Sequence, residues 1–155
     1  MAHTSPFYVP LLALFCFVAF WCVANFGVSR ISGWHTLAKR FTATSEPYGE
    51  FRSVGPWFLT VYFRGSWLKY GSIVRLRAAH DALYLSILLP FRIGHPPLCI
   101  PWNEISFSET TQFFMRFVVL TLGEQERVSM RISVKAAEKL DLLNRMNVQK
   151  APAGS

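Results

Sequence analysis

The apolar residues of this chain are concentrated in one uninterrupted stretch near the N-terminus. Residues 7–28 read FYVPLLALFCFVAFWCVANFGV and contain no Asp, Glu, Lys or Arg. A bilayer hydrocarbon core of ~30 Å needs about 20 helical residues, so this stretch is long enough to span it. Pro6 and Pro10 stand where the first turn of a helix tolerates a missing N–H donor. We predict a short segment over residues 1–6 and a transmembrane helix over residues 7–28.

A cleaved signal peptide is the competing interpretation of this stretch. Signal peptides have a basic n-region, an apolar core of about 7–15 residues and small residues at the cleavage site. Here the preceding segment, MAHTSP, has no Lys or Arg, and the bulky Phe26 stands near the end of the apolar core. The sequence therefore favours a retained anchor.

The charged residues that flank the helix predict its orientation. None precedes it, whereas Arg30, Lys39 and Arg40 follow it closely. Cytoplasmic flanks carry the excess of Lys and Arg. We therefore expect a single-pass protein of the inner (cytoplasmic) membrane, with its N-terminus outside and its C-terminal domain in the cytoplasm.

Small and aromatic side chains recur at helical spacing along the predicted span. They are Ala13, Phe17, Phe20, Ala24 and Gly27. Small residues allow another helix to approach closely, and the rings could fill gaps against helices, lipid or a flat pigment. Bulk that faces lipid is an equally good interpretation. The span has no His, the usual axial ligand of haem or a chlorin, so we expect no cofactor bound through side-chain ligands. A non-covalent lipid or pigment contact stays open.

Residues 30–56 predict a juxtamembrane segment. Within it, residues 32–41 have the pattern of a short amphipathic helix that lies against the bilayer or the domain, with apolar residues at Trp34, Leu37 and Phe41. Residues 42–56 are polar and rich in Pro and Gly, which indicates a loop.

From residue 57 the apolar pattern changes to the period of a strand. Alternating or continuous apolar stretches predict strands over residues 57–63, 73–77, 82–89, 98–105, 113–122 and 127–133. Ser133 is a suitable N-cap for a following amphipathic helix. We predict a mainly β domain over residues 57–148, with six or seven antiparallel strands and a C-terminal helix. A disordered tail is expected over residues 149–155.

The motifs in this domain resemble those of a known superfold. The segments ALYLS (82–86), Phe91-Arg92 and IPWNEI (100–105) are similar to the pleckstrin-homology superfold, in particular its bacterial and GRAM-like branches. The resemblance covers residues 55–148. It implies binding of lipid headgroups or proteins rather than catalysis. It also implies headgroup contacts in the first hairpin loop, where Arg64 and Lys69 stand, with Arg75 and Arg77 in the next strand.

The chain is basic, with 16 Lys and Arg against 9 Asp and Glu. This balance indicates an acidic partner, and anionic lipid is the one that a membrane-held domain meets by default. The basic residues form no long run and no nucleic-acid module, so we expect no nucleic-acid partner. Contacts with headgroups or an acidic partner are predicted for Arg30, Lys39, Arg40, Arg64, Lys69, Arg75 and Arg77.

The sequence offers little that is typical of catalysis. Cys16, Cys22 and Cys99 form no zinc-binding pattern, and His80-Asp81 is typical of a turn. There is no nucleophile elbow, phosphate loop or HExxH motif. We therefore expect a non-enzyme without a metal site.

Aromatic residues and one Pro-rich loop indicate contact surfaces instead. Predicted protein contacts are Trp67, Arg92, His95 and Trp102. His95 stands in FRIGHPP (91–97), where it either makes an external contact or caps the loop by bonding a carbonyl.

Our leading hypothesis is an accessory subunit that packs into and stabilises a larger integral membrane complex. A photosynthetic reaction centre or a respiratory assembly is the expected kind, because such assemblies recruit one-helix subunits. The alternative is a self-sufficient membrane-surface adaptor that binds anionic lipid headgroups.

Overall fold

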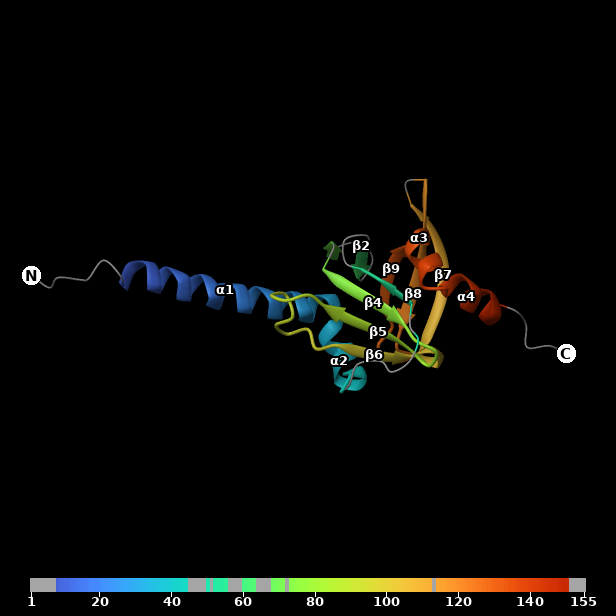
Figure 1. The fold of residues 1–155 in the computed structure, drawn as a ribbon, viewed down its shortest axis with the longest axis horizontal. Coiled ribbons are helices and arrows are strands. Elements are labelled where there is room, and N and C mark those ends of the chain that lie inside the picture. Colours follow the sequence, from blue (N-terminus) through green and yellow to red (C-terminus); the bar gives the residue numbers. More distant parts are fainter. Residues whose placement is uncertain are drawn as a thin grey trace, which may run out of the picture.

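A long N-terminal helix leads into a mainly β domain that ends in two short helices (Figure 1). This is seen in a computed structural model, which describes residues 8–44, 50, 52–55, 60–63, 68–71, 73–112 and 114–150. The elements are α1 (Tyr8–Ser32), α2 (Trp34–Phe41), β1 (Arg52–Val54), β2 (Thr60–Phe63), β3 (Leu68–Gly71), β4 (Val74–Ala78), β5 (Ala82–Ile87), β6 (Leu98–Pro101), η2 (Trp102–Glu104), β7 (Ile105–Gln112), β8 (Met115–Leu122), β9 (Val128–Ser133), α3 (Val134–Lys139) and α4 (Leu142–Lys150). The predicted fold class, an apolar N-terminal helix followed by a mainly β domain with a C-terminal helix, is confirmed.

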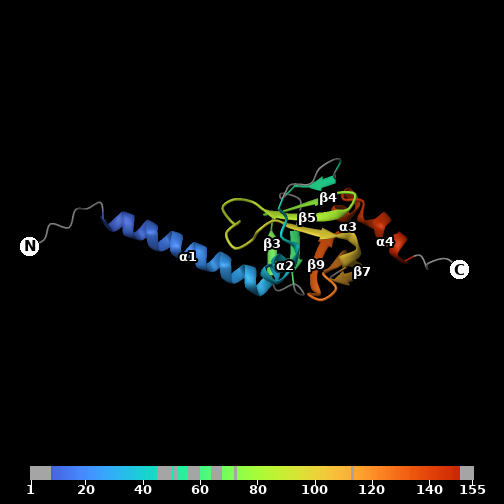
Figure 2. The same cartoon turned by 90° about the horizontal axis from the view of Figure 1, so that it is seen from below.

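Helix α1 projects away from the domain, with the N-terminus at its far end (Figures 1 and 2). It is long and apolar enough to cross a membrane, and it continues past the predicted end at Val28 to Ser32. The side chains from Tyr8 to Phe20 are exposed. The apolar surface of this part of α1 therefore has no partner among the residues that the structure describes.

The strands form two sheets. The first has the order β1-β4-β5-β6 and the second the order β3-β2-β9-β8-β7, with every neighbouring pair antiparallel. Buried and accessible side chains alternate along β4 and β9, as expected for strands with one face on the core. The apolar core therefore consists of one face of each sheet, with α2 and α3 packed against it.

Helix α2 packs on the domain rather than on a bilayer. Its predicted apolar residues, Trp34, Leu37 and Phe41, are all buried in the core. The Trp34 ring packs edge-on against Phe63 at 5.9 Å between centroids, and its indole N–H donates to Pro96 O at 2.9 Å. The sequence left open whether this helix lies against the bilayer or against the domain. The burial of its apolar side chains shows that it lies against the domain.

The described residues contain nine strands, where six or seven were predicted. The additional strands are short or polar. β1 and β3 have three and four residues, and β7 reads ISFSETTQ with only its first residue buried. Such strands give no sustained alternation, because their partners and not their own apolar faces define them. β1 also lies within the segment that was predicted as a loop.

The C-terminal helix begins where Ser133 was predicted to cap it. The Ser133 side chain accepts a hydrogen bond from Ala136 N at 3.3 Å. The helix is then interrupted at Asp141, which has a φ of 60° and separates α3 from α4. α4 continues to Lys150, so residues 149 and 150 are helical rather than part of a disordered tail. Residues 151–155 lie outside the described part of the chain.

Candidate functional site

The loop between β5 and β6, residues 88–97, lies against the last turns of α1. The rings of Phe91 and Trp21 are 5.1 Å apart between centroids, and the Ser29 hydroxyl donates to Gly94 O. Gly94 has a φ of 75°, and a Cβ there would lie 3.2 Å from the Phe26 Cα. Glycine is therefore required both by the left-handed backbone and by the close approach of the helix. We call this contact between α1 and residues 88–97 the helix–domain joint.

His95 holds the base of this loop from inside. It is 1% exposed, with Nδ1 lying 3.1 Å from Ile93 O and Nε2 lying 3.0 Å from the Tyr70 hydroxyl. A carbonyl oxygen can only accept, so Nδ1 carries the proton and Nε2 accepts from Tyr70. His95 thus bonds a loop carbonyl, which was the second of the two roles that the sequence left open.

Two titratable residues at the joint, His95 and its partner Tyr70 on β3, are held in their neutral forms. Burial lowers the pKa of His95, although hydrogen bonds to the Ile93 and Phe91 backbone oppose this effect. Burial likewise raises the pKa of Tyr70, with a smaller opposing effect of the Ser32 hydroxyl. At neutral pH the pair is therefore an uncharged hydrogen-bonded link between β3 and the loop.

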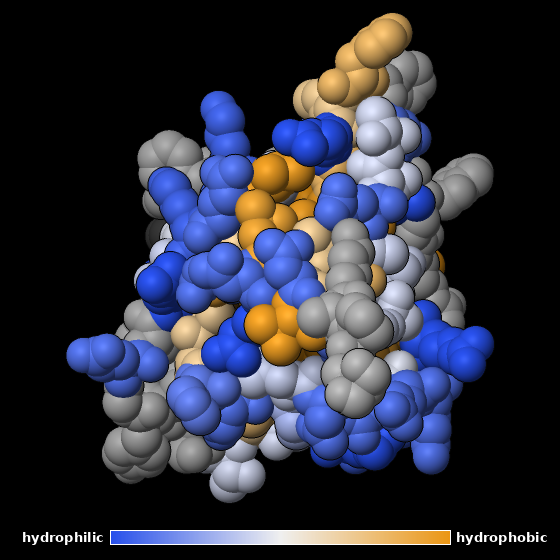
Figure 3. All heavy atoms as spheres, turned by 90° about the vertical axis from the view of Figure 1, so that its right-hand side faces the viewer, coloured by the Kyte–Doolittle hydropathy of each residue, from blue (hydrophilic) through white to orange (hydrophobic). Residues whose placement is uncertain are grey.

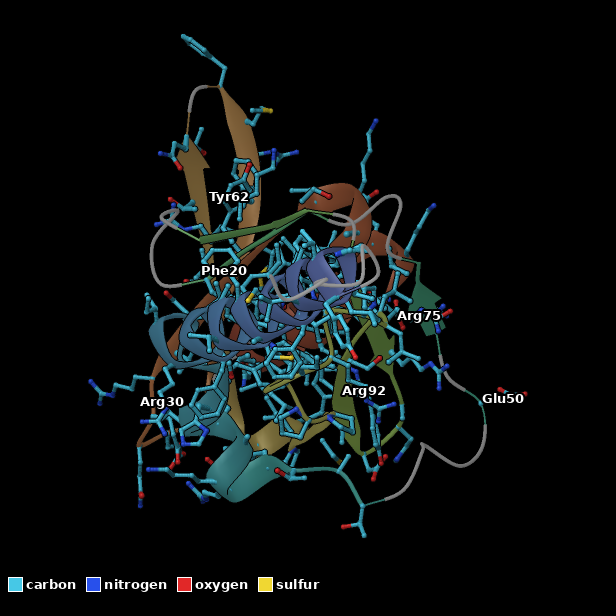
Figure 4. The ribbon with its side chains drawn as sticks, turned by 90° about the vertical axis from the view of Figure 1, so that its left-hand side faces the viewer. Phe20, Arg30, Glu50, Tyr62, Arg75 and Arg92 are labelled. Carbon is cyan, nitrogen blue, oxygen red and sulfur yellow. The ribbon has the colours of Figure 1, made fainter. Side chains whose placement is uncertain are left out.

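Three arginines line one cleft on the outer face of the first sheet. Arg75 and Arg77 come from β4, and Arg92 comes from the loop after β5. The cleft has a volume of about 460 Å³, and its described lining residues include no Asp or Glu. Figure 4 shows Arg75 and Arg92 on the same side of α1, away from Arg30. We call this feature the arginine cleft.

The other described residues that line the arginine cleft are uncharged, so the arginines give the cleft a positive charge. Tyr84 forms part of its wall, and its pKa is raised to about 12 by a hydrogen bond with Cys99, then by burial and by the negative charges of Cys99 and Asp81. The Tyr84 hydroxyl therefore stays protonated at neutral pH. The arrangement has the chemistry of an anion-binding site, because guanidinium groups match phosphate and carboxylate oxygens.

Lys69 does not belong to this cleft. It lies beside a separate, mostly apolar cavity of about 270 Å³ between α1 and the domain. The walls of that cavity are Trp21, Ala24, Asn25 and Val28 of α1, with Tyr70, Ile73, Phe91 and His95 of the domain. Of the basic residues predicted to contact headgroups, Arg75 and Arg77 therefore line the arginine cleft, whereas Lys69 lines the cavity beside α1.

The remaining predicted cations have other surroundings. Arg40 forms ion pairs with Glu104 and Glu126. The Arg30 guanidinium carbon lies 4.9 Å from the centre of the Phe26 ring, and Lys39 is exposed on α2. Arg64 lies outside the described residues, as does the predicted contact residue Trp67.

Trp102, a predicted protein contact, has its contacts within the chain. Its indole N–H donates to Ala79 O at 3.0 Å, and the Arg145 guanidinium carbon lies 4.2 Å from its ring centre. Arg145 also donates to Ala79 O and His80 O, each at 3.3 Å. Trp102 therefore helps to hold α4 on the domain.

The residues predicted to pack in the membrane lie on different parts of α1. The side chains of Ala13, Phe17 and Phe20 are exposed. Ala24 lies in the wall of the cavity at the helix–domain joint, and Gly27 is half-buried.

Sequence reasoning missed the aromatic residue of the domain that is the most exposed among those the structure describes. Phe114 stands at the end of the β7–β8 hairpin and is fully exposed, and Met115, which follows it, is 59% exposed. Figure 1 shows this hairpin projecting sideways from the long axis of the molecule. In Figure 3 the face opposite α1 is mostly hydrophilic, and the projection at its top is pale orange. The signal was present, because residues 113–115 read FFM, but the pattern indicated the interior of a strand.

No constellation typical of metal binding occurs among the residues that the structure describes, where groups of three His, Cys, Asp or Glu side chains were sought. The arrangement therefore offers contact surfaces: the exposed part of α1, the hairpin tip and the arginine cleft. No family model matches the chain, and no curated protein matches it.

Proposed function

We propose that the chain is a non-catalytic, single-pass accessory subunit of a larger integral membrane complex. In this proposal α1 crosses the inner membrane with its N-terminus outside, and the β domain lies on the cytoplasmic face. The exposed apolar surface of α1 packs against helices of the complex, while the domain contacts its cytoplasmic part.

The observation that carries the proposal is the apolar tip of the β7–β8 hairpin. A fully exposed Phe114 beside an exposed Met115 is costly in water and typical of an anchor in a protein interface. The hairpin points sideways from the axis of α1 (Figure 1). With α1 across the bilayer, the tip would extend parallel to the membrane surface, toward a neighbouring protein and away from lipid.

The helix–domain joint supports the same function. The ring contact of Phe91 with Trp21 and the bond from Ser29 to Gly94 fix the domain relative to α1. A fixed domain presents the hairpin tip in one direction, which is what a subunit of a defined complex requires. A surface sensor gains nothing from that constraint.

The alternative, a membrane-surface adaptor for anionic lipid, is favoured by the arginine cleft. Its three arginines give one side of the domain a local positive charge. The alternative predicts that the protein leaves the membrane as a monomer. Its lipid contacts should weaken steeply with ionic strength, whereas helix packing should not.

A photosynthetic or respiratory identity of the complex stays a prediction from the sequence.

Sizing of the solubilised protein tests the proposal. The tagged full chain is extracted from its own membranes with a mild detergent, and its particle size is measured for the wild type, for Phe114→Ser and for Val148→Ser. Val148 is an exposed apolar residue of α4 and serves as the matched control. We expect a large particle for the wild type and for Val148→Ser. Phe114→Ser should release about half or more of the protein, since an aromatic anchor contributes ~2 kcal/mol or more.

A wild-type protein that migrates as a monomer in the mildest detergent would contradict the subunit function. Release by both variants to the same extent would show that the hairpin tip has no special role.

A further inference from the structure

The joint fixes how deep the β5–β6 loop lies in a membrane that α1 crosses. The inference rests on that crossing, which is part of the proposed function. The charge-free part of α1 ends at Ser29, and about 20 residues counted from Tyr8 reach Gly27. Trp21 is therefore six residues, or about 9 Å, inside the cytoplasmic edge of the hydrocarbon. Because Phe91 packs on Trp21, the loop lies within the cytoplasmic leaflet.

The composition and bonding of the loop suit this depth. Leu89 and Ile93 are 79% and 43% exposed, although both are large and apolar. Its backbone is folded on itself, with Phe91 N donating to Leu88 O and His95 N donating to Arg92 O, each at 2.9 Å. Satisfied backbone groups are required wherever lipid replaces water. Figures 1 and 2 show the loop on the side of the domain from which α1 projects.

The arginine cleft then lies at the level of the lipid headgroups. Leu88 and Leu89 of the loop form one end of its wall, and Leu88 N donates to Ile73 O at 3.0 Å, which ties the loop to the start of β4. Arg75 follows two residues after Ile73 and is exposed, as is Arg92. Arginines near a hydrocarbon edge extend their guanidinium groups to the phosphate layer.

We propose that the arginine cleft binds the phosphate of an anionic phospholipid in the cytoplasmic leaflet, with Leu89 against its acyl chains. Arg75 of β4 and Arg92 of the loop supply guanidinium groups from two different elements, and Arg77 lines the same cleft. The described lining of the cleft contains no Asp or Glu. This site uses Arg92, which the sequence had placed in a protein contact, and it excludes Lys69.

A photocrosslinking experiment tests the site in the full chain. Leu89 is replaced by p-benzoylphenylalanine, and the protein is reconstituted into nanodiscs with equal amounts of phosphatidylcholine and phosphatidylglycerol. After irradiation, mass spectrometry of the intact protein identifies the attached lipid. We expect phosphatidylglycerol adducts to exceed phosphatidylcholine adducts about fivefold, as befits one or two cations at the headgroup level.

Matched variants identify the groups responsible. The double variant Arg75→Gln, Arg92→Gln should abolish the lipid preference while the total adduct yield stays high. Arg116→Gln removes an exposed charge of β8 and should leave the preference unchanged. Millimolar inorganic phosphate should have little effect. If inorganic phosphate abolished the preference for phosphatidylglycerol, the cleft would be a site for free phosphate, and the lipid site would be overturned.

A second probe at Val18 separates the two ways in which the experiment can fail. Val18 lies on the exposed part of α1. Lipid adducts at Val18 without any at Leu89 would overturn the lipid site and leave the membrane crossing intact. No adducts at either position would contradict the crossing itself. An unchanged preference in the double variant would also overturn the site.

Discussion

At the scale of single residues, His95 shows how burial and charge are coupled in the joint. Its ring contacts the Tyr70 hydroxyl, the Ile93 carbonyl and the ring of Trp34, which is nearly perpendicular to it with its centre 5.4 Å away. Protonation of Nε2 would turn the acceptor of the Tyr70 bond into a second donor. Lys69 lines the same cavity as His95, and its positive charge would oppose a charge on the imidazole further.

The stability of the protein should therefore fall in mild acid. The folded state lowers the pKa of His95 below its ordinary value of about 6.5, so the unfolded chain takes up a proton that the folded chain excludes. The contribution of neutral His95 is complete above about pH 6.5 and is lost as the pH falls. We expect the Tm of the chain in detergent micelles to be lower at about pH 5.5 than at about pH 7.5.

His95→Gln and His80→Gln distinguish this origin from other titrations. His95→Gln should lower the Tm at neutral pH and flatten its pH dependence. His80 is exposed in a turn, so His80→Gln should keep the wild-type dependence. An equal flattening by both variants would contradict the assignment to His95.

At the scale of elements, the β5–β6 loop joins the helix to the domain through a glycine. Gly94→Ala would place a residue with a Cβ in the left-handed region and 3.2 Å from the Phe26 Cα. We expect a loss of about 1–2 kcal/mol in unfolding free energy from the backbone conformation alone. Chemical unfolding in micelles, followed by near-ultraviolet circular dichroism of the Trp residues, measures it.

Gly55→Ala is the matched control for this substitution. A Cβ at Gly55 meets nothing within 4 Å, and its φ is outside the left-handed region. Its effect should stay within about 0.5 kcal/mol. Equal effects of the two substitutions would show that Gly94 has no special place in the joint.

The same elements show which parts of the fold a sequence can predict. β9, Val128–Ser133, was predicted to within one residue of its observed start and with its observed end, because apolar and polar residues alternate along all of it. β7 was missed because its side chains are mostly polar and exposed, and its position depends on pairing with β8. The hydrophobic pattern within a segment predicts a helix or a strand. It does not show which other segment a strand will pair with.

The sites follow the same rule. The basic residues were identified one by one, but that Arg92 joins Arg75 and Arg77 while Lys69 lies elsewhere depends on how the loop folds. The bond from Ser29 to Gly94 connects residues 65 positions apart. A hydroxyl and a glycine give no sign in the sequence that they will meet.

At the scale of the whole molecule, α1 and the far face of the domain differ in polarity, and the helix–domain joint connects the two parts. The exposed side of α1 is apolar, and the face of the domain opposite α1 is mostly hydrophilic (Figure 3). This polarity along the long axis matches a bilayer on one side and water on the other. Under the proposed function, the hairpin tip contacts a protein beside the domain, and the arginine cleft contacts a lipid beneath it.

The most direct test of this account is the membrane topology of the intact chain. Val148→Cys provides an exposed thiol on α4, outside the proposed protein interface, and a membrane-impermeant maleimide reports the side on which it lies. We predict that the protein stays in the membrane pellet after alkaline carbonate treatment. We also predict rapid labelling of the introduced thiol in inside-out vesicles, and labelling in right-side-out vesicles only after they are permeabilised. Release by carbonate, or labelling in intact right-side-out vesicles, would contradict a transmembrane α1 that holds the domain in the cytoplasm.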